Sequence, residues 1–461
     1  MKKRRLLLWL PLLCFTCCGI YSCAPKLQDV EAPIDEPQEF TYSGDDLVPD
    51  KWWTAFDDPA LNLLVETGLE ENLALAGNWE QFRAALAVVR RESSYLWPAI
   101  GASAQTARSR PQPDFAGGEN FQLGLSASYE VDLWGRIQSG IEAEEFRAQA
   151  TYYDYQSAAM TLSAEISNAW YRLLTARKQL ELANKQIETN ENIMRLIRAR
   201  FVGGQIRAVD ILRQEQLLES TRNQKIAYET QVELFENELA VLLGSPPQNL
   251  MELPKDSLPG LPPLPATGLP LELIRRRPDV LQAYNLVLAT DRDMAQAIRS
   301  KFPQLSLNVQ GQNRSNDYNS LFQNWAYTLA GNIAAPIFYA GRIRAEVDRT
   351  EALKNRQLYL YGQTVLTAFR EVEDAMVREI KQKEQLEVLQ RRTELAEKTS
   401  RQLRLEFLNG ISEYLDVLLT LDQEQQLERD ILEARQSLLE IRVALYRALA
   451  GGFEPERPAE P

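Results

Sequence analysis

Histidine is absent from this chain of 461 residues, and cysteine is nearly absent. The lack of histidine removes the commonest general base and the commonest metal ligand. The four cysteines all fall near the start of the chain, at Cys14, Cys17, Cys18 and Cys23. No Walker-type glycine-lysine motif occurs, so any energy from ATP would have to come from a partner protein. We therefore expect a protein that is not an enzyme and that holds no cofactor and no metal.

The clustered cysteines belong to a segment that is typical of a signal peptide. A basic start from Lys2 to Arg5 precedes an apolar run from Leu6 to Phe15. The string Ile20-Tyr21-Ser22-Cys23 resembles a bacterial lipobox, which predicts a lipid on Cys23. Tyr21 departs from the usual small or aliphatic residue. The alternative is an ordinary signal peptide that happens to be rich in cysteine.

Acidic residues outnumber basic ones, 64 to 51, and long apolar runs are lacking in the rest of the chain. The formal net charge is −13, which argues against a nucleic-acid partner because a phosphate-binding surface must be basic. After the leader, no stretch approaches the roughly 18 continuous apolar residues that indicate a transmembrane helix. An exported chain of this kind is expected to be free in solution, tethered by a lipid, or part of a β-barrel.

The chain contains a duplication with a constant offset of 206 residues. A repeat of this length indicates a duplicated architecture and not a solenoid of small units. The matching pairs include Gly135 and Gly341, Arg136 and Arg342, Glu165 and Glu371, Phe201 and Phe407, Gly204 and Gly410, and Asp210 and Asp416.

Each copy contains a very long helical stretch. Between Ala159 and Phe201 the apolar residues alternate three- and four-residue steps, with Asn190 as the only polar position. This spacing of 3.5 residues is typical of a coiled coil. Because no proline interrupts residues 137–201 or 343–407, each could be one helix roughly 100 Å long. A cytoskeletal rod or an adhesin stalk would show the same periodicity.

Upstream of each long helix the hydrophobic period changes from 3.5 to 2. Strands are expected at about 98–108, 121–132, 303–313 and 325–336. One face of each is apolar and the other carries small polar residues, which matches a transmembrane barrel with a watery lumen. A soluble β-sandwich is the alternative. Four strands cannot close alone, since open edges are forbidden in lipid and the smallest single-chain barrels use about eight. A trimer with twelve strands is the natural closed solution.

Six strings in this chain resemble motifs of the TolC-like outer-membrane efflux lipoproteins, also called outer membrane factors or NodT-type efflux lipoproteins. They appear in the family's order, and the resemblance as a whole runs from about Lys51 to Gly452. The strings are KWWTAFDDPAL at 51–61, YEVDLWGR at 129–136, RRRPDV at 275–280, APIFYAGR at 335–342, EVEDA at 371–375 and YLDVL at 414–418.

The resemblance implies an α+β membrane protein. Its expected architecture is a trimeric twelve-stranded β-barrel, four strands per chain, continuing into a long coiled-coil α-barrel with two internal repeats. The implied layout is a signal peptide (1–22), a lipid-anchored extended segment (23–58), repeat 1 (59–244), an equatorial linker (245–271), repeat 2 (272–452) and a tail (453–461).

The resemblance also implies a function and the residues that serve it. The chain would be the outer-membrane exit channel of a tripartite efflux pump, extending into the periplasm and docking a periplasmic adaptor and an inner-membrane pump. An exit duct for type I protein secretion, and a periplasmic structural rod or adhesin, are the alternatives. The expected adaptor-docking tips are Val202, Gly203 and Gly204 in the first copy and Leu408, Asn409 and Gly410 in the second.

The same resemblance assigns the periplasmic gate to Asp416, with Asp210 as its counterpart in the first copy. Three Asp416 carboxylates around a pore would repel one another and attract cations. Phe407 and Ser412 stand where the family's Tyr and Arg tether the closed gate, so those tethers are not transferred to this chain. For Asp210, the alternative is a capping role at a helix start.

Overall fold

The computed structural model describes residues 31–35, 37–46, 48–110, 118–247, 258–315, 320, 322–449 and 453. Cys23 and the expected signal peptide lie outside the described residues, as do parts of the expected linker and tail. Two compact units make up the chain, and each takes segments from both repeats. The first unit contains Gln81–Tyr152 and Gln282–Gln363, and the second contains Ile34–Glu80, Tyr153–Leu281 and Thr364–Pro461.

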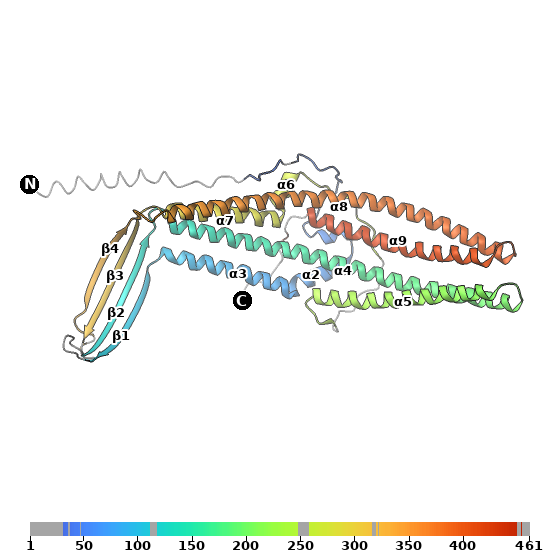
Figure 1. Cartoon of the computed structure of the whole chain (residues 1–461), viewed down its shortest axis with the longest axis horizontal. Coiled ribbons are helices and arrows are strands. Elements are labelled where there is room, and N and C mark those ends of the chain that lie inside the picture. Colours follow the sequence, from blue (N-terminus) through green and yellow to red (C-terminus); the bar gives the residue numbers. More distant parts are fainter. Residues whose placement is uncertain are drawn as a thin grey trace, which may run out of the picture. The chain divides into compact units, whose positions relative to one another are not determined.

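Two very long helices pass through both units. They are α4 (Arg136–Val202) and α8 (Arg342–Leu408), each of 67 residues (Figure 1). Their bounds lie within one residue of the proline-free stretches, because an unbroken coiled-coil period has no internal stop signal. None of the helices in the described part of the chain is long and apolar enough to cross a membrane.

The first unit contains an antiparallel sheet whose strands follow chain order (Figure 1). The strands are β1 (Ala99–Ser109), β2 (Gly118–Val131), β3 (Gln304–Ser315) and β4 (Ala326–Ala334). β4 ends before the expected residue 336, because Pro336 has no N–H to donate to a ladder. Within the described sheet, β1 and β4 each have one edge without a neighbouring strand.

The register gives the sheet one apolar and one polar face. Ile100, Ala127, Val309 and Leu329 form one row across all four strands. The next row consists of Gly101, Ser126, Gln310 and Thr328. The apolar row is not covered by other described parts of the chain at its ends, since Ile100 is 80% and Leu329 77% exposed. A soluble sandwich would bury such a face against a second sheet, and the described residues contain a single sheet of four strands.

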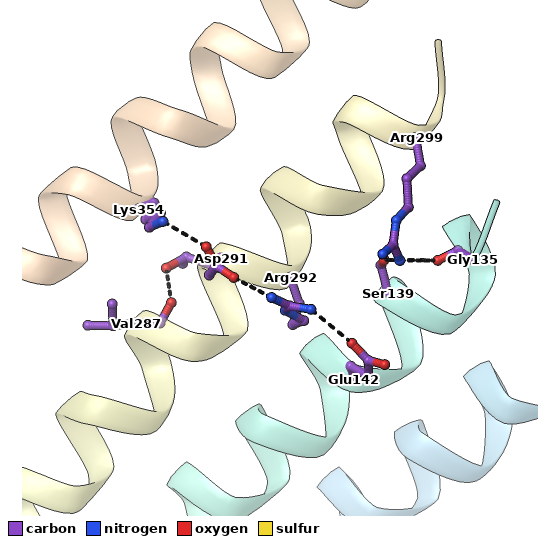
Figure 2. Close-up of polar contacts among 9 residues, drawn as sticks. Gly135, Ser139, Glu142, Val287, Asp291, Arg292, Arg299 and Lys354 are labelled. Atoms are coloured by element: carbon purple, nitrogen blue, oxygen red, sulfur yellow. Dashed lines mark hydrogen bonds and ion pairs between the residues drawn. The ribbon is translucent and has the colours of Figure 1, made fainter. Parts of the chain in front are cut away.

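At the helical end of the sheet, polar side chains hold three helices together (Figure 2). α7 (Pro278–Arg299) reaches α8 through Asp291, which accepts a hydrogen bond from Lys354 at 2.7 Å. Its next residue, Arg292, contacts Glu142 of α4 at 3.3 Å. Arg299 donates to the carbonyl of Gly135 at 2.7 Å. These contacts fix α7 between α4 and α8.

Among the described residues of the second unit, the regular structure is helical apart from one isolated bridge between Asp46 and Pro265. It contains η2 (Trp52–Phe56), α2 (Pro59–Glu71), α5 (Ala208–Leu242), α6 (Pro270–Arg276) and α9 (Tyr414–Leu449). It also contains most of α4, most of α8 and the start of α3 (Leu73–Ser93). The rest of α3 belongs to the first unit and leads through η3 (Ser94–Leu96) to β1.

An aromatic cluster in the second unit explains the string at residues 51–61. Trp52 is fully buried, stacks on Tyr446 at 6.1 Å and donates its indole N–H to Ser163. Asp58 caps α2 and also accepts the indole N–H of Trp170 at 2.9 Å. The residues of this string therefore serve packing and helix capping in the core of the unit.

A buried ion pair joins α8, α9 and the segment between the repeats. Arg442 and Glu379 are 0% and 1% exposed and approach to 2.6 Å. The same guanidinium donates to the carbonyls of Pro262 and Pro263. Glu379 is a polar residue in the coiled-coil seam of the second copy, and its partner explains how a carboxylate is tolerated there.

Candidate functional site

Two equivalent turns close the helical hairpins of the second unit. After α4, Gly204 has φ +72°, and the N–H of Gln205 donates to the carbonyl of Arg200 at 2.9 Å. After α8, Gly410 has φ +75°, and the N–H of Ile411 donates to the carbonyl of Glu406 at 2.9 Å. This bond across five residues, with a left-handed glycine, is the Schellman way of ending a helix.

The predicted tip residues lie at these turns and are open to solvent. A Cβ added to Gly204 or Gly410 would meet no atom within 4 Å, so backbone conformation and not crowding favours glycine at both positions. Val202 is 88% exposed and Leu408 46% exposed, and Ile411 beside them is 74% exposed. Apolar side chains without cover at a tip indicate a surface that a partner could bury.

The two candidate gate aspartates have different surroundings. Asp210 is 3% exposed and accepts the backbone N–H of Arg207 at 3.3 Å. It also lies 3.3 Å from the guanidinium of Arg207 and 3.5 Å from that of Arg213. The hydrogen bond to Asp210, followed by the charge of its carboxylate, raises the pKa of Arg207. Asp210 therefore stabilises the first turn of α5.

Asp416 occupies the equivalent position in the first turn of α9 but is exposed. Across the residues that the structure describes, its carboxylate has no hydrogen-bond or ion-pair partner. The positions that match the two arginines hold Glu413 and Leu419. The carboxylate of Asp416 is thus free to face a pore or a ligand.

Arg200 joins the first hairpin to the second. Its guanidinium donates to the carbonyls of Phe407 and Leu408 at 3.1 and 3.0 Å, and its charge lies 4.8 Å from the centre of the Phe407 ring. Phe407 in turn packs against Tyr414 with ring centroids 5.4 Å apart. The cation therefore binds the carboxyl end of α8, where the helix dipole favours positive charge.

A buried polar network continues from this link into the helices. The hydroxyl of Tyr414 donates to Gln214 at 2.5 Å, and the amide of Gln214 donates to the carbonyl of Asn190. Asn190 also bonds to Thr221 and Gln425. Burial, with a smaller contribution from the charge of Asp210, raises the pKa of Tyr414, so its hydroxyl stays protonated as a donor. Tyr414 and its neighbours thus connect α4, α5 and α9 by neutral hydrogen bonds.

Sequence reasoning placed the glycine turns and the aspartates but missed Arg200 and Gln214, and it named Tyr414 only as the first residue of the string at 414–418. Asn190 could have led to the network, because it is the only polar residue in an otherwise apolar seam. Arg200 gave no such signal, since it lies outside the seam and its counterpart in the second copy is Glu406. Ser412 donates to the carbonyl of Leu403 at 3.3 Å.

Comparisons with known proteins agree on one family. The family described as "Outer membrane efflux protein" matches residues 64–245 and 269–451. The pyoverdine export outer membrane protein OpmQ of Pseudomonas aeruginosa is 30% identical over 96% of each chain. The toluene efflux pump outer membrane protein TtgF of Pseudomonas putida is 29% identical over 87% of this chain and 85% of its own.

The solved structure of the outer-membrane channel OprN has the same fold. It matches with a TM-score of 0.86 and 27% identity, and the match covers 93% of this chain and 99% of OprN. The resemblance predicted from the sequence is therefore confirmed. So is the predicted class of fold, in which four strands per chain adjoin long helices.

Proposed function

Because this chain belongs to the outer membrane efflux protein family, we propose that it is the passive exit channel of a tripartite efflux pump. Proteins of this family are efflux channels of the outer membrane and not enzymes. The observation that carries the proposal is the four-stranded sheet with one exposed apolar face, attached to helices that end in exposed apolar tips. Small molecules named for two relatives, pyoverdine and toluene, favour efflux over protein secretion.

The edges of the sheet support a trimer. β1 and β4 each present an unpaired edge within the described sheet, and such edges cannot persist in lipid. Pairing β4 of one copy with β1 of the next removes all edges only when a ring closes. Three copies give twelve strands, which exceeds the roughly eight strands of the smallest barrels.

The helical tips are the proposed docking surface for a periplasmic adaptor, which in turn connects an inner-membrane pump. Val202, Gly203 and Gly204 form one tip, and Leu408, Asn409 and Gly410 form the other. The two surfaces differ in their side chains, so the adaptor would meet two unlike tips per chain. The lipid anchor on Cys23 belongs to the same proposal; loss of palmitate labelling in Cys23→Ser would support it, and unchanged labelling would contradict it.

The gate is assigned to Asp416, with Asp210 as a supporting residue of the first copy. In a trimer three exposed Asp416 carboxylates would face one another near the entrance and repel. Their repulsion would favour widening, and a bound cation would favour closure. Asp210 differs because two arginines already neutralise it.

Planar-bilayer conductance of purified full-length protein tests the channel and the gate together. Asp416→Ala should change the cation selectivity and the block by divalent cations, because the negative ring is removed. Asp422→Ala is the matched control, since Asp422 is also an exposed aspartate of α9. A protein that never conducts would contradict the channel. Identical selectivity and block in wild type and Asp416→Ala would contradict the gate assignment alone.

A further inference from the structure

A polar cavity of about 590 Å³ lies in the first unit between α4, α7 and α8. Its charged lining comes from all three helices and includes both signs. The charged residues are Arg136 and Arg147 from α4, Asp293 from α7, and Glu346 and Arg349 from α8. Three guanidinium groups and two carboxylates therefore face one space.

These groups retain capacity for a ligand. Arg136 contacts Glu130 through one terminal nitrogen, while its buried Nε has no hydrogen-bond partner among the described residues. Arg349 pairs with Glu346, one turn away on the same helix, and both are about half exposed, so that pair is weak. Arg147 pairs with Glu144 on its own helix and with Asp293, yet burial raises the pKa of Asp293. A further cationic donor would stabilise the ionised form of Asp293.

The walls of the cavity are held in place independently of any ligand. The network from Lys354 through Asp291 and Arg292 to Glu142 crosses the same three helices (Figure 2). Arg292 is 5% exposed within it. Because these contacts cross all three helices through side chains outside the cavity lining, the helices are held together at this level by more than the charges that line the cavity.

The cavity begins where the strands end. Arg136 follows the end of β2 at Val131 by five residues. At the same end Trp134 stacks on Phe302 at 5.0 Å, and Ile337 and Phe338 are 95% and 86% exposed. Exposed apolar and aromatic residues at strand ends are typical of a membrane interface.

The depth of the cavity matches a layer of lipid headgroups. Glu346 and Arg349 lie four and seven residues into α8, which is roughly 6 to 10 Å along its axis. The headgroup region occupies roughly 5 to 8 Å on each side of the hydrocarbon core. Glu346 and Arg349 therefore lie in or next to that layer if the strands span the membrane. Arg147 starts farther away, eleven residues or roughly 16 Å into α4, and its guanidinium reaches Asp293 of α7.

We propose that this cavity binds the headgroup of a zwitterionic phospholipid that carries a primary amine, the phosphoethanolamine type. Its phosphate is bound by Arg136 and Arg147, because guanidinium groups match phosphate oxygens in pairs. Its ammonium donates to Asp293 and Glu346. A trimethylammonium group has no N–H to donate, so a phosphocholine headgroup is disfavoured. The proposal rests on the proposed function, since the sheet must lie in the membrane.

The test is a titration of purified full-length oligomers in detergent, followed by native mass spectrometry. The added probes are phosphatidylethanolamine, phosphatidylcholine, phosphatidylglycerol and soluble glycerophosphoethanolamine. Phosphatidylethanolamine should bind about tenfold more tightly than phosphatidylcholine, the effect of about one charge-assisted hydrogen bond. Glycerophosphoethanolamine binding as tightly as the lipid would overturn the lipid assignment and indicate a site for a water-soluble solute.

Variants distinguish binding of the phosphate from binding of the ammonium group. Arg147→Gln should weaken the binding of all three phospholipids about tenfold. Asp293→Asn should weaken the binding of phosphatidylethanolamine alone by about the same factor. Arg349→Gln provides a second phosphate-side variant at a more exposed position. Arg391→Gln, an exposed arginine of α8 in the second unit, is the control and should bind as wild type does. Equal binding by all variants would refute the proposal.

Conductance of the same proteins keeps this proposal distinct from the channel proposal. A variant that conducts normally but has lost its preference for phosphatidylethanolamine supports the headgroup site. Wild-type protein that conducts and shows no preference among the lipids contradicts the headgroup site and leaves the channel standing. Wild-type protein that binds the lipid selectively but never conducts contradicts the channel alone.

Discussion

Replacing Arg200 by glutamine is expected to loosen the two hairpins of one chain from each other. Arg200 belongs to the end of α4, and its guanidinium makes three contacts with the end of α8. These are the carbonyls of Phe407 and Leu408, at 3.1 and 3.0 Å, and the ring of Phe407, at 4.8 Å. A glutamine side chain at this position could keep one hydrogen bond but would lose the second bond, the charge and the ring contact.

The contacts set the size of the effect. A hydrogen bond to a charged donor contributes about 1.5 to 3 kcal/mol, and partial exposure of this site favours the lower end. A cation over an aromatic ring at an exposed site adds about 0.5 to 1 kcal/mol. The expected loss is about 2 kcal/mol per chain, which is about a 30-fold shift in the ratio of separated to joined hairpins.

The assay is the resting open probability of single channels in planar bilayers. Arg198→Gln is the matched control, since Arg198 is an exposed arginine of the same helix turn. Arg200→Gln should raise the open probability, and Arg200→Lys should raise it less because it keeps the charge. If Arg200→Gln and Arg198→Gln both conduct as wild type does, the link between the hairpins does not restrain the channel, and the reasoning fails.

Two further predictions concern stability in the second unit. Arg442→Met should lower the free energy of unfolding by about 3 kcal/mol, because Glu379 would keep a buried charge with only Lys383, at 2.8 Å, as its partner; a thermal midpoint equal to that of the exposed-site control Arg435→Met would contradict this. Burial, with the nearby carboxylates Glu424 and Glu397, raises the pKa of Glu428, although Gln186 and Arg429 oppose the shift. Wild-type stability should therefore fall as the pH rises from the unfolded pKa through the raised folded one. Glu428→Gln should have a higher melting temperature than wild type at pH 7 and the same melting temperature near pH 4. A lower melting temperature than wild type at pH 7 would refute the predicted direction of the pH dependence.

Local signals in the sequence were sufficient for the long elements. The 3.5-residue period and the absence of proline marked α4 and α8 nearly to the residue. Alternation marked the strands, because each side chain's face follows from its neighbours in the chain. The glycine turns were also predictable, since a helix that ends at Gly204 or Gly410 needs only a left-handed residue.

The strand order depends on long-range pairing. β2 of the first copy pairs with β3 of the second, with Ala127 opposite Val309. No local pattern specifies that partner, because a β-strand with one apolar face can pair with many others. The duplication indicated that two strand pairs exist, and the tertiary structure joined them into one sheet.

The candidate site could be predicted only in part from the sequence, because some of its contacts also join residues that are distant in the chain. The sequence already contained the difference between the two aspartates, since arginines at 207 and 213 are replaced by Glu413 and Leu419 in the second copy. Whether those arginines reach Asp210 was a matter of helix geometry. Arg200 illustrates the limit, because its partners lie more than 200 residues away in the chain.

The sequence by itself determined the duplicated plan, the coiled-coil helices, the amphipathic strands and the family. These properties are repeated along the chain, so each stretch carries its own signal. The tertiary structure decided which aspartate is neutralised and which stays free, which cation joins the hairpins, and where charges of both signs share a cavity. Those outcomes depend on side chains brought together from distant helices, and the energy of such contacts depends on distance and burial, which only the folded chain defines.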